Sequence, residues 1–242
     1  MAATHQPDSG NAGKARVFIS YSRKDVDAAE QIRSDLAECG FDAYLDKHDI
    51  LPGEPWQERL AKLVEAADGV AFLVSPDSIT SPICEWEVNE AERLSKRVLP
   101  VVVRDVAAKD VPGRLRRLNF IFLRREDDRG VGIETLATAL LTDIVWVREH
   151  TRLNELASRW STTQRADTLL RGGDLIEAER WIASRPAESP EPTPAHRALI
   201  EASRRAATRR QRLTVSLAVS TAIVHTYPLA SAPSDPTQLR AT

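Results

Sequence analysis

The chain has 242 residues, 42% hydrophobic and 28% charged, which is enough to bury the cores of one or two ordinary soluble domains. Its formal net charge of −2 provides no overall positive field, so no nucleic-acid partner is expected. Two cysteines, Cys39 and Cys84, and five scattered histidines form neither a disulfide framework nor a metal-ligand pattern. These counts favour a reducing, cytoplasmic environment and no metal.

Residues 1–14 are small and polar and predict a disordered leader, because they lack the apolar stretch of a signal peptide. Over residues 15–150, short apolar runs alternate with amphipathic segments. We expect strands at 16–21, 41–45, 70–74, 98–103 and 119–123, and helices at 25–39, 56–67, from Pro82 onward and at 133–150. Pro100 within the fourth run argues against a complete ladder there. The alternation predicts an α/β fold with a flavodoxin-like, five-stranded parallel sheet.

The segment that follows the third predicted strand combines a strong helix start with a misplaced charge. Ser81 and Pro82 are typical of an N-cap and a first helical residue. At 100° per residue, Glu87 falls on the apolar arc of this helix, where burying a carboxylate is costly. Either Glu87 accepts a local hydrogen bond or lies at the open end of the arc, or it is kept in a cleft for chemistry or ligand binding.

Ligands of such sheets bind outside the carboxyl ends of the strands. The predicted strand ends carry residues 21–23, Asp46 with the loop that it begins, and Ser75. Glu87 reaches the same edge from the second turn of its helix. The sequence therefore predicts a ligand site at this edge.

Three motifs in this region resemble those of one family. Residues 17–22 (Val-Phe-Ile-Ser-Tyr-Ser) resemble the first box of TIR (Toll/interleukin-1 receptor) domains, and residues 46–53 resemble their BB loop. Residues 75–87 resemble the segment that holds the glutamate of catalytically active TIR domains. The motifs occur in the correct order, and the resemblance spans about residues 15–150.

For the enzymatic branch of the family, the resemblance implies cleavage of NAD at the nicotinamide–ribose bond in signalling or defence. The products are nicotinamide and ADP-ribose or a cyclic isomer, and no cofactor other than the substrate NAD is implied. Glu87 is then the catalytic carboxylate, and Glu90 is the second choice. The substrate-binding residues implied are Tyr21, Ser22 and Arg23 on the ribose and phosphate side, Asp46 and Leu51 closing over the nucleotide, and Ile83. For Tyr21 and Asp46, capping of the strand ends is the alternative role.

One departure from the family keeps a second function open. Active relatives often carry tryptophan four residues before the glutamate, where this chain has Ile83. Trp86 projects about 100° away from Glu87 along the helix and is a poor substitute. The alternative is a non-catalytic TIR module that acts by self-assembly. A phosphoacceptor receiver domain is a third reading, but it needs an aspartate where the chain has Ser75.

The resemblance also implies self-association through residues 46–55. Ile50 and Leu51 would be exposed apolar anchors, and Pro52 and Gly53 would set the turn. A head-to-tail contact of this kind propagates into open strands. In the alternative, the two apolar side chains fold back on their own domain.

Beyond residue 150 the pattern predicts helices only. We expect a helical annex at 151–187, a proline-rich linker at 188–195, a basic helix at 196–212, a weak membrane segment at 213–234 and a tail at 235–242. Residues 213–234 contain no charged side chain and follow the basic run 204–212, the order of a positive flank before a span. Because the apolar part is shorter than the ~20 residues of a span, weak membrane contact through residues 204–234 and a disordered tail remain alternatives.

Overall fold

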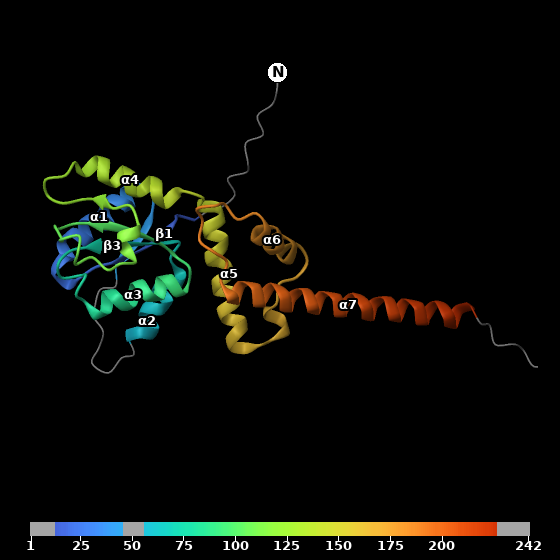
Figure 1. The fold of residues 1–242 in the computed structure, drawn as a ribbon. Coiled ribbons are helices and arrows are strands. Elements are labelled where there is room, and N and C mark those ends of the chain that lie inside the picture. The colour runs from blue at the N-terminus through green and yellow to red at the C-terminus, as the bar shows by residue number, and fades with distance from the viewer. Residues whose placement is uncertain (1–12, 46–55, 227–242) are drawn as a thin grey trace, which may run out of the picture.

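A computed structural model of the chain describes residues 13–45 and 56–226, with side chains to residue 212. Its centre is a five-stranded, all-parallel sheet in the order β2-β1-β3-β4-β5 (Figure 1). The strands are β1 (Arg16–Ser20), β2 (Asp42–Leu45), β3 (Gly69–Val74), β4 (Arg97–Val102) and β5 (Ile121–Phe122). This order is that of flavodoxin-like sheets, so the predicted fold class is confirmed.

Helices cover both faces of the sheet. One face carries α1 (Val26–Glu38) and α4 (Arg129–Leu141), and the other carries α2 (Trp56–Ala66) and α3 (Pro82–Arg93). The side chains of β1 alternate accordingly, because successive residues of a strand point to opposite faces. Val17 and Ile19 enter the core beneath α1 and α4, whereas Phe18 packs with residues of α2 and α3.

Two expectations about the sheet needed adjustment. β4 pairs with β3 over its whole length, Arg97–Val102, so Pro100 does not interrupt that ladder. β5 is shorter than the predicted 119–123, and its pairing with β4 is confined to the registers Val101–Ile121 and Val102–Phe122. The edge strand therefore contributes little to the sheet.

The single helix predicted at 133–150 is wrong. The chain forms α4 and then α5 (Ile144–Thr163), bent by 61° at the break. Asp143 has φ of 51°, a left-handed conformation that ends the helical path. α4 also begins earlier than predicted, because the Asp128 carboxylate accepts a hydrogen bond from the Val131 amide at 3.2 Å and caps the helix.

Gly132 lets α4 approach β5 closely. A Cβ at this position would lie 2.7 Å from the Phe122 carbonyl oxygen and 2.5 Å from Leu123 Cδ2. We expect Gly132→Ala to lower the free energy of unfolding by about 1–3 kcal/mol, because the backbone oxygen cannot move aside freely. Gly130→Ala is the matched control on the same helix, since its Cβ would meet only the Asp128 side chain, at 3.3 Å. Urea unfolding of both variants tests this, and equal stabilities would contradict the close-approach argument.

After the sheet domain, three helices form the annex: α5, α6 (Gly172–Ala183) and α7 (Pro194–Thr226). Their shared core includes Trp146 and Trp181, whose rings stack with centroids 4.5 Å apart, together with Leu153 and Leu199. Trp181 Nε1 donates to the Trp146 carbonyl at 3.1 Å. These two tryptophans thus serve packing.

The annex is docked on the sheet domain through buried polar contacts. Lys96, which precedes β4, donates through Nζ to the Ala67 carbonyl at 2.8 Å and to Thr151 Oγ1 of α5 at 3.2 Å. Asn154 Nδ2 of α5 donates to the Leu94 carbonyl at 3.2 Å. Because these polar groups are buried and paired across the boundary, the contacts fix how the two units meet.

The residues predicted as a proline-rich linker are packed against the annex. Ser189 Oγ donates to Asp143 Oδ2 at 2.7 Å, and Thr193 Oγ1 donates to Asn154 Oδ1 at 3.3 Å. α7 begins at Pro194, two residues before the predicted start of the basic helix. Segment 188–195 is therefore an ordered strap and not a free spacer.

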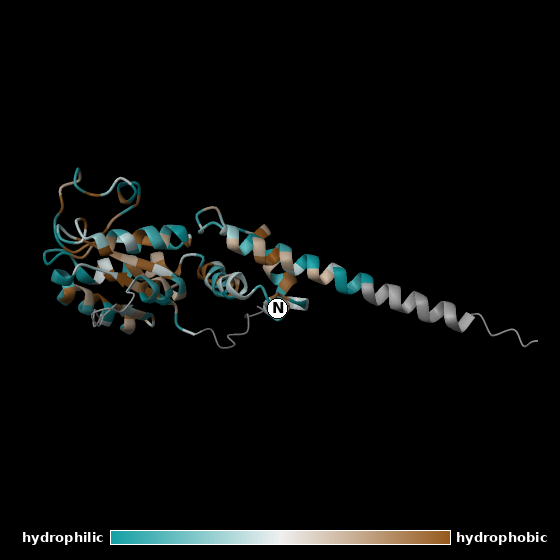
Figure 2. Ribbon diagram, turned by 90° about the horizontal axis from the view of Figure 1, so that it is seen from below, coloured by the Kyte–Doolittle hydropathy of each residue, from teal (hydrophilic) through white to brown (hydrophobic). Residues whose placement is uncertain are grey.

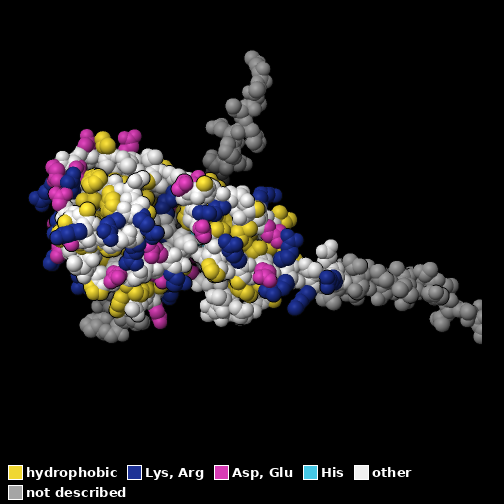
Figure 3. Space-filling model, in the orientation of Figure 1, with side chains coloured by type: hydrophobic (Ala, Val, Ile, Leu, Met, Phe, Trp, Pro, Cys, Tyr) yellow, Lys and Arg dark blue, Asp and Glu magenta, His cyan; other side chains and the backbone are white. Residues whose placement is uncertain are grey.

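The structure continues α7 without a break across residue 212, where a boundary was predicted. Hydrophobic residues are concentrated in the sheet and at the start of α7, where that helix crosses the annex (Figure 2). Beyond this crossing α7 projects away from the body, and basic side chains gather where it leaves the annex (Figure 3). Within the ranges that the structure describes, no single helix meets the length and hydropathy criteria for a membrane span; only the bent pair α4–α5 does so jointly.

Candidate active site

Glu87 lies in the second turn of α3 and is 3% exposed. The helix starts where predicted: Ser81 is the N-cap, its hydroxyl accepts a hydrogen bond from the Cys84 amide at 3.3 Å, and Pro82 follows. Ser20 Oγ, at the carboxyl end of β1, donates a hydrogen bond to Glu87 Oε2. The carboxylate is thus buried at the predicted edge of the sheet and held by the neighbouring strand.

Ser20 is a site residue that the sequence analysis missed. It occupies an inward position of β1, directly after Ile19, and both side chains are 0% exposed. A hydroxyl at such a position needs a partner, since an unpaired buried polar group is costly. That need was the available signal, but it did not identify the partner 67 residues away.

The Cys84 thiol lies close to this pair but is not a competing nucleophile. The pKa of Cys84 is raised to about 11, mainly by burial and to a smaller extent by the nearby Glu87 carboxylate. The group is therefore a protonated thiol at neutral pH, and the thiolate is the reactive form of cysteine. The chemistry of the site rests on the carboxylate.

A second polar cluster lies at the same edge and joins three strand ends. Asp25, 4% exposed, accepts a hydrogen bond from Ser75 Oγ at 2.6 Å and one from Arg104 Nε at 2.7 Å. Asp77 binds Lys24 Nζ at 2.6 Å and also Arg104, and these hydrogen bonds hold the pKa of Asp77 below its ordinary value. The cluster ties the segments after β1, β3 and β4 together, so it shapes the edge on which Glu87 lies.

We expect Asp25→Asn to lower the free energy of unfolding by about 1–2 kcal/mol, because an amide keeps a bond to Ser75 but loses the ion pair with Arg104. Asp77→Asn is the control, since Asp77 binds the same arginine from a more exposed position. Thermal unfolding compares the two. A larger loss in Asp77→Asn would show that the exposed pair, and not the buried one, holds this edge.

The other predicted substrate-binding residues differ in burial, and two of them lie outside the described residues. Tyr21 is 7% exposed and belongs to the core beneath α1 and α4. Ser22 is buried, and its carbonyl accepts a hydrogen bond from the Asp25 amide at 2.7 Å. Arg23 is exposed at the edge. Asp46 and Leu51 lie outside the described residues, as does the rest of the loop 46–55.

Ile83 and the two other candidates on α3 have structural partners. Ile83 is half-buried and packs on the core between α2 and α3. Trp86 meets Trp56 edge-on, with ring centroids 5.5 Å apart, which commits it to the α2–α3 contact. Glu90 forms hydrogen bonds of 2.7 and 2.6 Å with Arg93. Among these groups, only Glu87 combines burial with a place beside β1.

A five-stranded parallel sheet with a carboxylate of α3 at its carboxyl edge defines a flavodoxin-like α/β domain with a candidate active site. The sequence profile described as TIR domain matches residues 17–137, which is 121 of 242 residues. The chain therefore belongs to the TIR domain family.

Several known proteins are similar to this chain. The stimulator of interferon genes protein of Magallana gigas is 29% identical over a stretch that covers 46% of this chain and 29% of that protein. The TIR domain of the Toll-related receptor TRR-2 from Hydra magnipapillata aligns with 22% identity and a TM-score of 0.45, over 51% of this chain and 96% of that one. A TIR-STING receptor from C. gigas in complex with 2',3'-cGAMP aligns with 25% identity and a TM-score of 0.44, over 51% and 38%.

Proposed function

We propose that the TIR domain of this chain cleaves NAD at the nicotinamide–ribose bond, with Glu87 as the catalytic carboxylate. The observation that carries the proposal is the burial of Glu87 at the carboxyl edge of the sheet, where Ser20 donates a hydrogen bond to it. A buried carboxylate in an otherwise apolar helix face is costly, and functional sites are where such costs concentrate.

The reaction suits a single carboxylate. The nicotinamide of NAD is a cationic leaving group, so its departure requires no general acid. The ribosyl group becomes an oxocarbenium ion in the transition state, and a nearby negative charge stabilises that ion. In our proposal Glu87 holds the ribose hydroxyls and supplies the charge, Ser20 orients the carboxylate, and Arg23 lies on the phosphate side.

The direct test is to incubate the purified protein with NAD and to quantify nicotinamide and ADP-ribose by chromatography. The Glu87→Gln protein, shown to be folded by circular dichroism, is the matched control. Release of nicotinamide by the parent and not by the variant supports the proposal. No release by the parent at any protein concentration would overturn it.

The second candidate function is a non-catalytic module that acts by self-assembly. Ile83 favours it, because this residue occupies the position where active relatives often carry tryptophan and its side chain is engaged in the α2–α3 core. Measuring self-association and NAD consumption on the same protein separates the two functions, because a non-catalytic module assembles without consuming NAD.

If cleavage requires assembly through residues 46–55, the specific activity should rise steeply with protein concentration. The reason is that an open sheet edge buries only part of a ligand as long as NAD, and a neighbouring copy would supply the missing wall. Gly53→Pro should lower activity and assembly together, as measured by dilution series and light scattering. Constant specific activity on dilution, with Gly53→Pro as active as the parent, would show that each monomer carries a complete site.

A further inference from the structure

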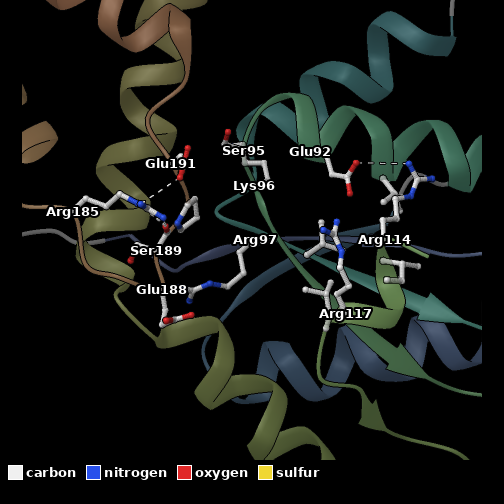
Figure 4. Close-up of a pocket in the computed structure, with 15 residues that line it drawn as sticks. Glu92, Ser95, Lys96, Arg97, Arg114, Arg117, Arg185, Glu188, Ser189 and Glu191 are labelled. Atoms are coloured by element: carbon white, nitrogen blue, oxygen red, sulfur yellow. Dashed lines mark hydrogen bonds and ion pairs between the residues drawn. The ribbon is translucent and has the colours of Figure 1, made fainter. Parts of the chain in front are cut away.

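A cleft of about 570 Å³ lies between the sheet domain and the annex, away from the proposed active site (Figure 4). One wall is formed by the end of α3, the start of β4 and the short helix η2 (Leu115–Arg117). The other wall is formed by Arg185 and by the first half of the strap, residues 188–191. Val88 of α3 lines the cleft, whereas its neighbour Glu87 is directed to β1. The cleft exists only because the annex is docked.

The lining of the cleft is rich in positive charge. Five cationic side chains line it, Lys96, Arg97, Arg114, Arg117 and Arg185, against three carboxylates, Glu92, Glu188 and Glu191. The difference, five minus three, is +2 for the lining side chains of a protein whose overall charge is −2; just outside the lining, Asp143 lies 4.0 Å from Arg97 and Glu85 lies 3.9 Å from Arg114. A concave surface with a local charge opposite to that of the whole protein attracts anions specifically to that place.

Two of the lining carboxylates pair with arginines at the ends of the cleft. Arg114 Nη1 lies 3.8 Å from Glu92 Oε2, and Arg185 Nη1 lies 3.5 Å from Glu191 Oε1, at opposite sides (Figure 4). Arg114 Nε is buried and has no hydrogen-bond partner among the described residues. A donor left unsatisfied in a basic cleft is a place for a ligand acceptor.

The centre of the cleft is occupied by Arg97 and Arg117 (Figure 4). Arg97 Nη1 donates to the main-chain carbonyls of Ala139 and Thr142, at 3.0 and 2.5 Å, and Arg97 Nη2 lies 4.0 Å from Asp143 Oδ2, a long ion pair that offsets part of its charge. In the part of the chain that the structure describes, Arg117 makes no hydrogen bond or ion pair. Its guanidinium is therefore available for a bidentate contact with a phosphate, the geometry that arginine favours.

The rest of the lining is apolar and comprises Val88, Val98, Leu115, Leu118 and Pro190. Leu118 is 38% exposed, which is high for a leucine beside a core. The volume of the cleft falls within the range of about 300–1,000 Å³ typical of small-molecule sites. Cations in the centre beside apolar side chains suit a ligand that combines phosphate groups with a planar ring.

We propose that this cleft binds a nucleotide that carries two phosphate groups, with the phosphates on Arg97 and Arg117 and the base against Leu118. Because both units line the cleft, the bound nucleotide stabilises the docked annex. The site is separate from the NAD-cleaving site and does not depend on that proposal.

The experiment uses the full chain and measures binding of ADP, adenosine and inorganic phosphate by calorimetry, with the thermal unfolding midpoint as a second readout. We expect ADP to bind and to raise the midpoint, since ligands that bind only the folded state stabilise it. Arg117→Ala should weaken ADP binding by about tenfold or more, the effect of losing one hydrogen-bonded charge. Arg116→Ala, an exposed neighbour outside the lining, is the matched control and should bind as the parent does.

Two further variants assign the result to this cleft. Leu118→Asn should weaken ADP binding and leave phosphate binding unchanged, whereas equal binding of phosphate and ADP by the parent would overturn the assignment of a nucleotide. Glu87→Gln should leave ADP binding unchanged. If Glu87→Gln abolishes ADP binding and Arg117→Ala does not, the nucleotide binds at the sheet edge and the proposal fails. Absence of ADP binding, or equal losses in Arg116→Ala and Arg117→Ala, would overturn it as well.

Discussion

Replacing Glu87 with glutamine should lower the rate of nicotinamide release from NAD by about 10²–10³-fold, the usual effect of removing one group that stabilises transition-state charge. Glutamine has nearly the same shape and still accepts the hydrogen bond from Ser20, so the fold should persist. Single-turnover assays of nicotinamide release, with the same protein checked by circular dichroism, measure the effect.

Glu90→Gln is the matched control, because Glu90 lies on the same helix and pairs with Arg93 near the surface. It should retain the activity of the parent. Activity that survives in Glu87→Gln but is lost in Glu90→Gln would move the catalytic assignment by about one turn of helix. Ser20→Ala provides an intermediate case: it removes the donor that orients the carboxylate and should reduce the rate less than the loss of the charge does.

Lowering the pH from about 7 to 5 should destabilise the annex by about 4 kcal/mol, through about 2 kcal/mol at each of two buried histidines. His150 and His196 lie in its core, 1% and 0% exposed, with ring centroids 4.7 Å apart. Burial is the main cause that lowers the pKa of His150 to about 3 and that of His196 to about 4, from an ordinary value of 6.5. Each group is thus neutral in the folded annex.

The direction of the pH effect on stability follows from the pKa values of the two histidines. Below pH 6.5 the unfolded chain binds a proton at each histidine and the folded chain does not. The stabilisation is therefore complete above about 6.5 and is lost as the pH falls toward the pKa values of the folded state. Lys96 also faces the pair, but its pKa, lowered by burial to about 8, keeps it charged throughout this window.

His196 has a structural reason to stay neutral. It stands three residues after Thr193, and the two form a reciprocal cap at the start of α7. The His196 amide donates to Thr193 Oγ1 at 3.3 Å, and the Thr193 amide donates to His196 Nδ1 at 3.1 Å. Protonation of Nδ1 would remove this acceptor.

Urea unfolding followed by tryptophan fluorescence at the two pH values measures the loss, since Trp146 and Trp181 lie in the same core. His196→Gln keeps a side-chain acceptor at the capping position but does not titrate, so it should remove about half of the pH dependence. An annex equally stable at both pH values would contradict the prediction.

Local sequence patterns were sufficient to predict most of the strands and helices of the sheet domain. Alternating apolar runs and the Ser81–Pro82 helix start predicted four strands and α3 within a few residues, because period and capping depend on neighbours in sequence. The same reasoning located Glu87, since a carboxylate on an apolar arc is visible in the sequence alone. The resemblance to TIR domains rests on these same segments, and the family is confirmed.

The errors occurred where a local signal was weak or absent. Residues 133–150 carry a continuous apolar pattern, and only the left-handed backbone of Asp143 splits it into α4 and α5. The strap 188–195 reads as a spacer by its prolines, but Ser189 and Thr193 find partners in α5 and at its start. Composition does not reveal such partners.

Contacts between distant residues were decided by the tertiary structure. Ser20 meets Glu87 across 67 residues, Asp25 meets Arg104 across 79, and Lys96 meets Thr151 across 55. Each pair satisfies a buried polar group, and many partners in the sequence would serve equally well until the chain has folded. The sequence by itself thus determined which segments form the sheet and that a carboxylate lies on α3. Only packing decided which hydroxyl holds that carboxylate and that a basic cleft opens between the two units, because both depend on where the helices meet.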